Sequence, residues 1–178
     1  MRKLIIIQIF LLLALQVYTQ SIPTQRNTYS KKPLEVMGFT AVSTFSQVKK
    51  QLNSWELQWD EVSLKKENSY GEQYKIKIDD VKYQGVQFSS IDFGFDSNGR
   101  IKSISFASYD DEDAVHNVIK ILCKDFPFRG YYKYGYLETE VYNGKDDSEF
   151  AYFPLAGFGF SFWFNTNIYD YFSNALNH

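Results

Sequence analysis

Two stretches of the sequence carry apolar residues at the spacing of an α-helix. The first spans residues 44–55, where Thr44 and Gln47 have the spacing of an N-terminal capping box. Its apolar face comprises Phe45, Val48, Leu52 and Trp55. The second follows the acidic run 110–113, which suits the positive end of a helix dipole, and ends before Pro127. Its apolar face comprises Val115, Val118, Ile119, Leu122 and Phe126. We therefore predict two amphipathic helices.

The remaining segments mostly alternate apolar and polar residues, which is typical of half-buried strands. The alternating runs are 72–79, 86–95, 101–106, 131–142, 148–155 and 157–164. We interpret 131–142 as a single strand that is followed by a turn at 143–147. Residues 168–175 return to helical spacing, which predicts a short C-terminal helix capped near Asn167.

The stretch 93–106 raises the question of a calcium loop, because a cluster of Asp, Asn and Gly lies between apolar flanks. With Gly99 as the sixth position of a helix–loop–helix calcium loop, Gly94 and Ser105 would occupy the first and twelfth positions, which need acids. The flanks also alternate like strands. The better interpretation is a β-hairpin in which Asn98 and Gly99 adopt positive φ.

The strand after this turn departs from strict alternation. Ile101 and Ile104 are three residues apart, whereas Ile104 and Phe106 are two apart. A β-bulge near Lys102 would bring all three apolar side chains to one face.

The order of helix, strands, helix and strands indicates one unit that is used twice. The predicted helices start near residues 44 and 111, and a Gly-x-x-Phe-Ser spacing at 85–89 recurs at 157–161, so both features repeat at a similar offset. We therefore predict an α+β fold with a mainly antiparallel sheet, two helices packed on one face, and a short C-terminal helix.

The first twenty residues have the pattern of a secretory signal peptide. A basic start at residues 2–3 precedes the apolar run 4–15, which is shorter than the roughly 20 residues that span a bilayer. Cleavage is expected immediately before or after Gln20, and an uncleaved membrane anchor is the alternative. The protein is thus expected to be exported, to the periplasm or outside the cell, without a transmembrane segment once the leader is removed.

The length and composition of the chain indicate a single domain after the leader. We assign residues 1–20 to the signal peptide, the polar stretch 21–33 to a flexible lead-in, and 34–178 to a single domain. The net charge of −2, without clusters of Lys or Arg, argues against nucleic acid as a partner. Cys123 is the only cysteine, so the chain forms no internal disulfide.

Tandem helix-then-strands units in a small exported protein resemble the repeats of β-lactamase-inhibitor proteins and of the small lipoproteins of outer-membrane assembly. The stretch "EVMGFTAVSTFSQVKKQL" at 35–52 also resembles the start of uncharacterised exported bacterial domains. The resemblance covers most of residues 34–165 and implies the architecture only. The inhibitors carry disulfides and the lipoproteins a lipidated cysteine, and both are lacking here.

Residues suited to catalysis or metal binding are sparse. His116 and Cys123 lie seven residues apart on one predicted helix, about 10 Å along its axis, which is too far for a thiolate–imidazole pair. A single cysteine and two distant histidines argue against zinc. We predict no catalytic residue, metal site or cofactor. Neighbouring carboxylates that leave a hydrolase open as an alternative occur at 79–80, 138 and 140, and 146–147.

The richest aromatic segment is "FPFRGYYKYGY" at 126–136. In a continuous strand Tyr132, Tyr134 and Tyr136 would point to one face, away from the more aliphatic set that begins at Leu137. If the helices cover the aliphatic set, the tyrosines line an open face. Residues flanking that face are Arg129 and Lys133. The alternative is that the C-terminal helix folds back and covers the tyrosines.

The sequence therefore predicts an exported, non-enzymatic envelope protein that binds another protein or a surface polymer through this tyrosine face. The identity of the partner does not follow from the sequence. The alternatives are a carbohydrate-binding module, because aromatic platforms beside carboxylates stack sugars, and a hydrolase that uses paired carboxylates.

Overall fold

The computed structural model describes residues 29–64, 68, 70–108, 112–134, 137–154 and 159–174. Its helices are α2 (Phe45–Ser54), α3 (Glu112–Leu122) and α4 (Ile168–Asn174). Its strands are β1 (Asp60–Ser63), β2 (Tyr74–Tyr83), β3 (Val86–Phe95), β4 (Ile101–Ser108), β5 (Phe128–Tyr134), β6 (Leu137–Asn143), β7 (Phe150–Pro154) and β8 (Gly159–Trp163). The predicted signal peptide lies outside the described residues.

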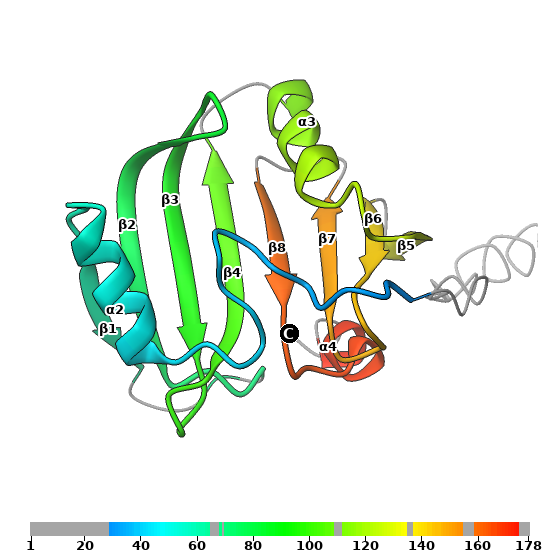
Figure 1. The fold of residues 1–178 in the computed structure, drawn as a ribbon. Coiled ribbons are helices and arrows are strands. Elements are labelled where there is room, and N and C mark those ends of the chain that lie inside the picture. The colour runs from blue at the N-terminus through cyan, green and yellow to red at the C-terminus, as the bar shows by residue number, and fades with distance from the viewer. Residues whose placement is uncertain are drawn as a thin grey trace, which may run out of the picture.

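All eight strands form one antiparallel sheet in the order β1-β2-β3-β4-β8-β7-β6-β5. Helix α2 precedes the meander β1–β4, and α3 precedes the meander β5–β8, so the chain uses one helix-then-strands unit twice (Figure 1). The two units meet where their last strands, β4 and β8, pair at the centre of the sheet. This arrangement confirms the predicted α+β fold and its repeat.

Of the two features that repeat in the sequence, the helix starts correspond to the structural repeat and the Gly-x-x-Phe-Ser spacing does not. Phe45 and Glu112 begin equivalent helices, as the predicted repeat requires. The matched segments near 85 and 157, by contrast, lead into β3 and β8, which are the third strand of one unit and the fourth of the other. That sequence match is therefore coincidental, because it relates strands at different places in their units.

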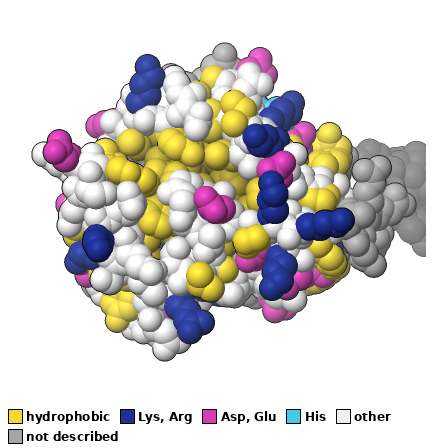
Figure 2. All heavy atoms as spheres, in the orientation of Figure 1, with side chains coloured by type: hydrophobic (Ala, Val, Ile, Leu, Met, Phe, Trp, Pro, Cys, Tyr) yellow, Lys and Arg dark blue, Asp and Glu magenta, His cyan; other side chains and the backbone are white. Residues whose placement is uncertain are grey.

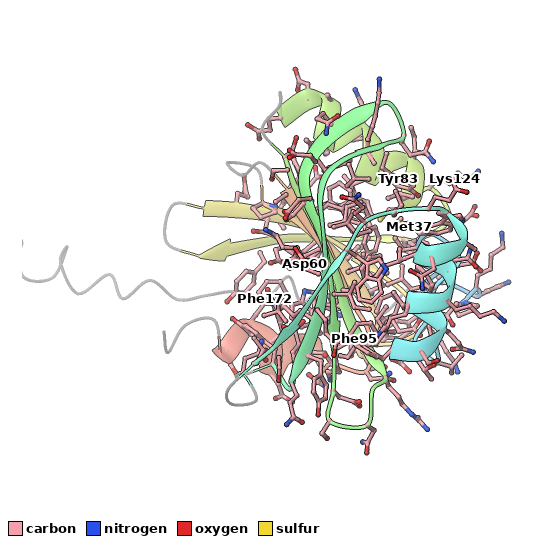
Figure 3. All side chains as sticks on the ribbon, turned by 90° about the vertical axis from the view of Figure 1, so that its left-hand side faces the viewer. Met37, Asp60, Tyr83, Phe95, Lys124 and Phe172 are labelled. Carbon is pink, nitrogen blue, oxygen red and sulfur yellow. The ribbon has the colours of Figure 1, made fainter. Side chains whose placement is uncertain are left out.

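The two faces of the sheet are covered differently. The larger core lies under α2, α3 and the segment before α2, whereas a smaller core lies under α4, on the opposite side (Figure 3). The larger core takes alternate residues of the central strands, for example Phe93, Phe106 and Phe162. The smaller core takes the intervening residues of the second unit, such as Trp163 and Phe150.

The hairpin between β3 and β4 confirms the interpretation of residues 93–106. The backbone carbonyl of Asp96 accepts a bond from the Gly99 amide at 2.9 Å, and its carboxylate accepts bonds from the amides of Asn98 and Arg100. Gly99 has positive φ, at 70°, but Asn98 does not, so the expectation of positive φ at Asn98 is wrong. The turn is a tight turn closed by one left-handed glycine. The described residues contain no cluster of three His, Cys, Asp or Glu side chains that could hold a metal.

The predicted β-bulge is present at Lys102. Ile101 pairs with Phe95 and Ser103 pairs with Gly94, which leaves Lys102 as the extra residue. Ile101, Ile104 and Phe106 consequently all reach the larger core. The extra residue thus reconciles the uneven apolar spacing with a single buried face.

Helix α2 begins and ends with specific capping contacts. Thr44 and Gln47 form the predicted capping box. At the other end, the Glu56 amide donates to Asn53 O at 3.0 Å, and the Leu57 amide donates to Leu52 O at 3.2 Å. This pair of hydrogen bonds is a Schellman motif, in which the residue at the Glu56 position is usually glycine. Glu56 has φ of 58°, a left-handed conformation that costs energy for a residue with a side chain.

We expect Glu56→Gly to stabilise the protein, by about 0.5–1 kcal/mol, because glycine adopts the left-handed conformation without steric cost. Denaturant unfolding measures the change. Glu35→Gly, at a site that has no positive φ, is the matched control and should not stabilise. Equal effects of both substitutions would contradict this account of the helix end.

Candidate functional site

The predicted open tyrosine face is not found at Tyr132, the one of its three tyrosines whose side chain the structure describes. Residues 131–142 are not one strand: β5 and β6 are separate strands that pair in antiparallel register. Tyr132 pairs with Thr139, so the two share a face instead of pointing apart. The prediction that Tyr132 and Thr139 point to opposite faces of the sheet is therefore wrong.

Tyr132 is buried, with 2% of its surface exposed. Its ring lies 4.0 Å from the ring of Phe172 in α4, centroid to centroid, and its hydroxyl donates to Phe172 O at 3.4 Å. The alternative, that the C-terminal helix covers this face, is the arrangement found at Tyr132. Lys133 and Tyr134 contribute their backbone to β5, but their side chains, like all of Tyr136, lie outside the described part of the chain.

Arg129, predicted to flank a binding face, is instead buried in a network of its own. Its guanidinium forms an ion pair with Asp147, donates to Asn143 Oδ1 at 3.3 Å, and donates to the Tyr169 hydroxyl at 2.6 Å. It also lies 5.2 Å from the centroid of the Tyr169 ring. Arg129 therefore joins β5, the turn after β6 and α4, and it has a structural role.

A polar cluster that the sequence did not predict lies beneath α3. His116 Nε2 lies 2.7 Å from Glu140 Oε2, and the Tyr142 hydroxyl donates to the same oxygen at 2.8 Å. The His116 ring also stacks on Phe153, at 4.6 Å between centroids and 7° between planes. Because the histidine and its carboxylate come from different elements, α3 and β6, they leave no local sequence signal. The cluster pins α3 to β6 and β7.

Four of the six neighbouring carboxylates considered for hydrolysis have separate partners. Asp79 pairs with Lys77 at 2.7 Å, Asp146 caps the Ser148 amide, and Asp147 binds Arg129. Glu140 is engaged by the cluster beneath α3. These contacts engage the four acids separately, each with a different partner.

Cys123 is buried at the end of α3, in the larger core. Burial raises the pKa of its thiol far above the ordinary value. Because the thiolate is the reactive form, we expect Cys123 to react with a thiol reagent much more slowly in the folded protein than in denaturant. A time course of labelling followed by intact mass measures this ratio. Equal rates in both conditions would contradict the buried position.

The face that carries α2 and α3 contains an exposed apolar groove. Apolar side chains gather in a band between these helices (Figure 2). The groove has a volume of about 300 Å³, and its lining comprises Met37, Trp55, Leu57, Val81, Lys82 and Tyr83. Met37 and Tyr83 lie on the same side of the sheet as α2 (Figure 3). We call this hollow the helix-face groove.

Three separate chain segments build the helix-face groove. Met37 comes from a tight turn in which Met37 and Gly38 both have positive φ, at 56° and 82°, between the paired residues Val36 and Phe39. Trp55 and Leu57 come from the Schellman end of α2. The end of β2 supplies Val81, Lys82 and Tyr83. The left-handed residues of both turns are what place these side chains at the groove, and left-handed non-glycine residues are enriched at functional sites.

The opposite face of the first unit is polar. Glu72, which is 2% exposed, lies over Gly94 and accepts bonds from Ser103 Oγ and from Asn68 Nδ2, the latter at 2.7 Å. A Cβ on Gly94 would collide with the Glu72 carboxylate, so glycine is required there. Beside them, Asp92 Oδ1 is buried without a hydrogen-bond partner among the described residues.

Burial raises the pKa of Asp92, although Lys75 and Lys77 act against the shift. An acid whose pKa is higher in the folded than in the unfolded state destabilises the fold as pH rises above its unfolded value. We therefore expect Asp92→Asn to stabilise the protein at pH 7, by on the order of 1 kcal/mol, and to lose that advantage near pH 3. Urea unfolding at both pH values measures it, and an equal gain at both would contradict the account.

A second, polar cavity lies where the loop around residue 70 meets the start of α4. Its volume is about 360 Å³, and its lining comprises Tyr70, Lys102, Asn165, Thr166, Asn167, Asp170 and Tyr171. It shares no lining residue with the helix-face groove. The two hollows differ in chemistry, since one is apolar with a single charge and the other is aromatic and polar.

No helix in the described part of the chain has the length and apolar character needed to cross a membrane. Comparisons with family models, with curated proteins and with solved structures found no match to this chain. The resemblance to tandem-repeat inhibitors and assembly lipoproteins therefore stays a prediction.

Proposed function

We propose that this chain is an exported binding module that docks an apolar segment of a partner protein in the helix-face groove. The observation that carries the proposal is the groove itself, an open apolar hollow of about 300 Å³ on the surface of a folded domain. Protein interfaces concentrate their binding energy in aromatic and aliphatic anchors that fill such hollows. Trp55, 40% exposed at its edge, is a residue type enriched in these anchors.

The single charged residue of the groove indicates the charge of the partner segment. Lys82 is the only charged residue in the lining, and it has no ion-pair partner among the described residues. A partner segment that carries Asp or Glu next to its apolar anchor would bury the anchor and pair with Lys82. Charge complementarity of this kind orients a bound segment and increases its rate of association.

Panning a random peptide library on the purified protein tests the proposal. We expect enrichment of peptides with an aromatic or aliphatic residue beside an acid. Trp55→Ser and Lys82→Glu should each weaken binding of the enriched peptides by about tenfold or more. Ile121→Ser is the matched control, because Ile121 is 53% exposed on α3 and lies outside the groove.

Thermal melting of each variant must show that the fold is retained. Enriched peptides that bind all three variants as tightly as the original protein would overturn the proposal. A library that yields no enriched sequence would also overturn it.

We also propose that residues 1–20 are removed on export to the periplasm or the cell exterior. The support is their basic start and short apolar run. The intact mass of the exported protein is expected to lack residues 1–19 or 1–20. Recovery of the full-length chain in the membrane fraction would contradict the proposal.

A further inference from the structure

Two irregularities of the backbone converge on the polar cavity between the loop at Tyr70 and the start of α4. The bulge in β4 turns Lys102 out of the regular alternation, and its ammonium donates to Asn165 O. Asn165 itself has φ of 50°, in the left-handed region. Bulges and left-handed residues commonly re-aim side chains at binding sites. Both residues line the cavity.

The aromatic side of the cavity is closely packed. Tyr70 lies 4.8 Å from Tyr171 and 5.3 Å from Trp163, centroid to centroid, and Tyr171 lies 4.6 Å from Trp163. The Tyr171 hydroxyl donates to the Tyr152 hydroxyl at 2.8 Å, which fixes the ring further. Tyr171 is buried, at 7% exposure, so its ring supports the partly exposed ring of Tyr70, which is the aromatic surface that a ligand can stack on.

Several polar groups of the lining have bonding capacity left over. Asn165 donates through Nδ2 to Ala41 O at 3.0 Å, so its Oδ1 still has no partner among the described residues. Asn167 accepts through Oδ1 from the amide of Tyr169 at 2.9 Å, so its Nδ2 is likewise left over. The Asp170 carboxylate has no partner in the described part of the chain. The cavity thus offers an amide acceptor, an amide donor and a carboxylate beside the partly exposed ring of Tyr70.

We propose that this cavity binds one pyranose ring of a carbohydrate. A sugar presents apolar C–H faces, which pack on aromatic rings, and a rim of hydroxyls, which each donate and accept hydrogen bonds. Side-chain amides and a carboxylate beside the Tyr70 ring match both features. A volume of about 360 Å³ is within the range of small-molecule sites.

The balance of charge selects a neutral sugar. The lining holds one cation, Lys102, and one anion, Asp170. Because these two charges offset each other, the lining has no net attraction for a phosphate, an acidic sugar or a cationic amine. The hydroxyls of an uncharged sugar ring can accept a hydrogen bond from Lys102 and donate one to Asp170, and the ring places no like charge beside either residue.

Chemical-shift mapping tests the proposal with defined probes. Glucose, galactose, N-acetylglucosamine and glucuronate are each titrated into ¹⁵N-labelled protein, to about 10 mM, since single sugar units bind weakly. We expect at least one neutral sugar, and not glucuronate, to shift the side-chain amide signals of Asn165 and Asn167. The amide signals of Trp55 and Tyr83, in the helix-face groove, should stay in place, which keeps this test independent of protein docking.

Variants that preserve the local backbone decide the outcome. Asp170→Asn removes only the charge, and Asn165→Gly removes the amide at a left-handed position that glycine tolerates. Each should weaken the sugar titration at least tenfold, whereas the control Asp60→Asn on β1 should not. No amide shift with any probe, or shifts that persist unchanged in both variants, would overturn the proposal.

Discussion

Phe106→Ala is expected to destabilise the protein by about 3–5 kcal/mol, which is the range for removing a large buried aromatic side chain. Phe106 is 2% exposed on β4, and its ring stacks on Phe160 of β8 at 4.5 Å between centroids. It also contacts the rings of Phe88 at 5.3 Å and Tyr83 at 5.7 Å. The contact with Phe160 crosses the seam between the two units, whereas the contacts with Phe88 and Tyr83 lie within the first unit, so the substitution removes packing from both.

Equilibrium unfolding in urea, followed by far-ultraviolet circular dichroism, measures this loss. Because the seam holds both units in one sheet, we expect a single transition that moves to lower urea concentration. Tyr131→Ala is the control, since Tyr131 is 46% exposed on the edge strand β5, and it should cost less than about 1 kcal/mol. A Phe106→Ala variant as stable as this control would contradict the packing at the seam.

Arg129→Ala is expected to cost about 3–5 kcal/mol, because it leaves a partly buried carboxylate without its ion-pair partner. Asp147 would lose the guanidinium, Asn143 would lose a donor, and Tyr169 would lose both a hydrogen bond and a cation–π contact. Three separated segments of the second unit would lose their common partner. The loss should appear as a lower free energy of unfolding.

Arg129→Lys separates charge from geometry. Lysine keeps the positive charge but lacks the planar fork that reaches several acceptors at once, so its cost should lie between those of the original protein and Arg129→Ala. Thermal melts of the three proteins give the order. A destabilisation below about 1 kcal/mol for Arg129→Ala would show that the network contributes little and that the residue is available for another role.

The features predicted correctly from the sequence are those that local patterns determine. The capping box at Thr44, the bulge at Lys102 and the turn at Gly99 each follow from residues close together in the chain. Helical and strand periodicity likewise reflect the burial of one face. The repeat of helix and strands follows from the order of these local elements.

The errors at the tyrosine segment arise from one missed turn and from contacts between distant segments. The alternation of tyrosines at 131–136 continues into 137–142, so the pattern predicts one strand. In the structure β5 ends at Tyr134. The residue that follows is a glycine, a residue type common in turns. Missing that break inverts the faces assigned to the two strands. The burial of Tyr132 and Arg129 then depends on α4, whose packing is not encoded near either residue.

Neither hollow could be found from the sequence. The helix-face groove joins Met37, the end of α2 and the end of β2, and the polar cavity joins the loop at Tyr70, the bulge and the start of α4. Each is assembled from segments that lie far apart in the chain. A search for positive-φ positions, such as Met37-Gly38 and Gln84-Gly85, would have found only the turns that flank the groove.

The central claim, that the helix-face groove docks a partner protein, is tested most directly by photo-crosslinking in the producing cells. A benzophenone amino acid replaces Trp55 at the groove or Ile121 on α3, and crosslinked peptides are identified by mass spectrometry. The account predicts an adduct from position 55 to an apolar segment that carries an acidic residue, its loss when Lys82 is changed to Glu, and no such adduct from position 121. Adducts of equal yield from both positions, or an adduct that Lys82→Glu leaves unchanged, would contradict it.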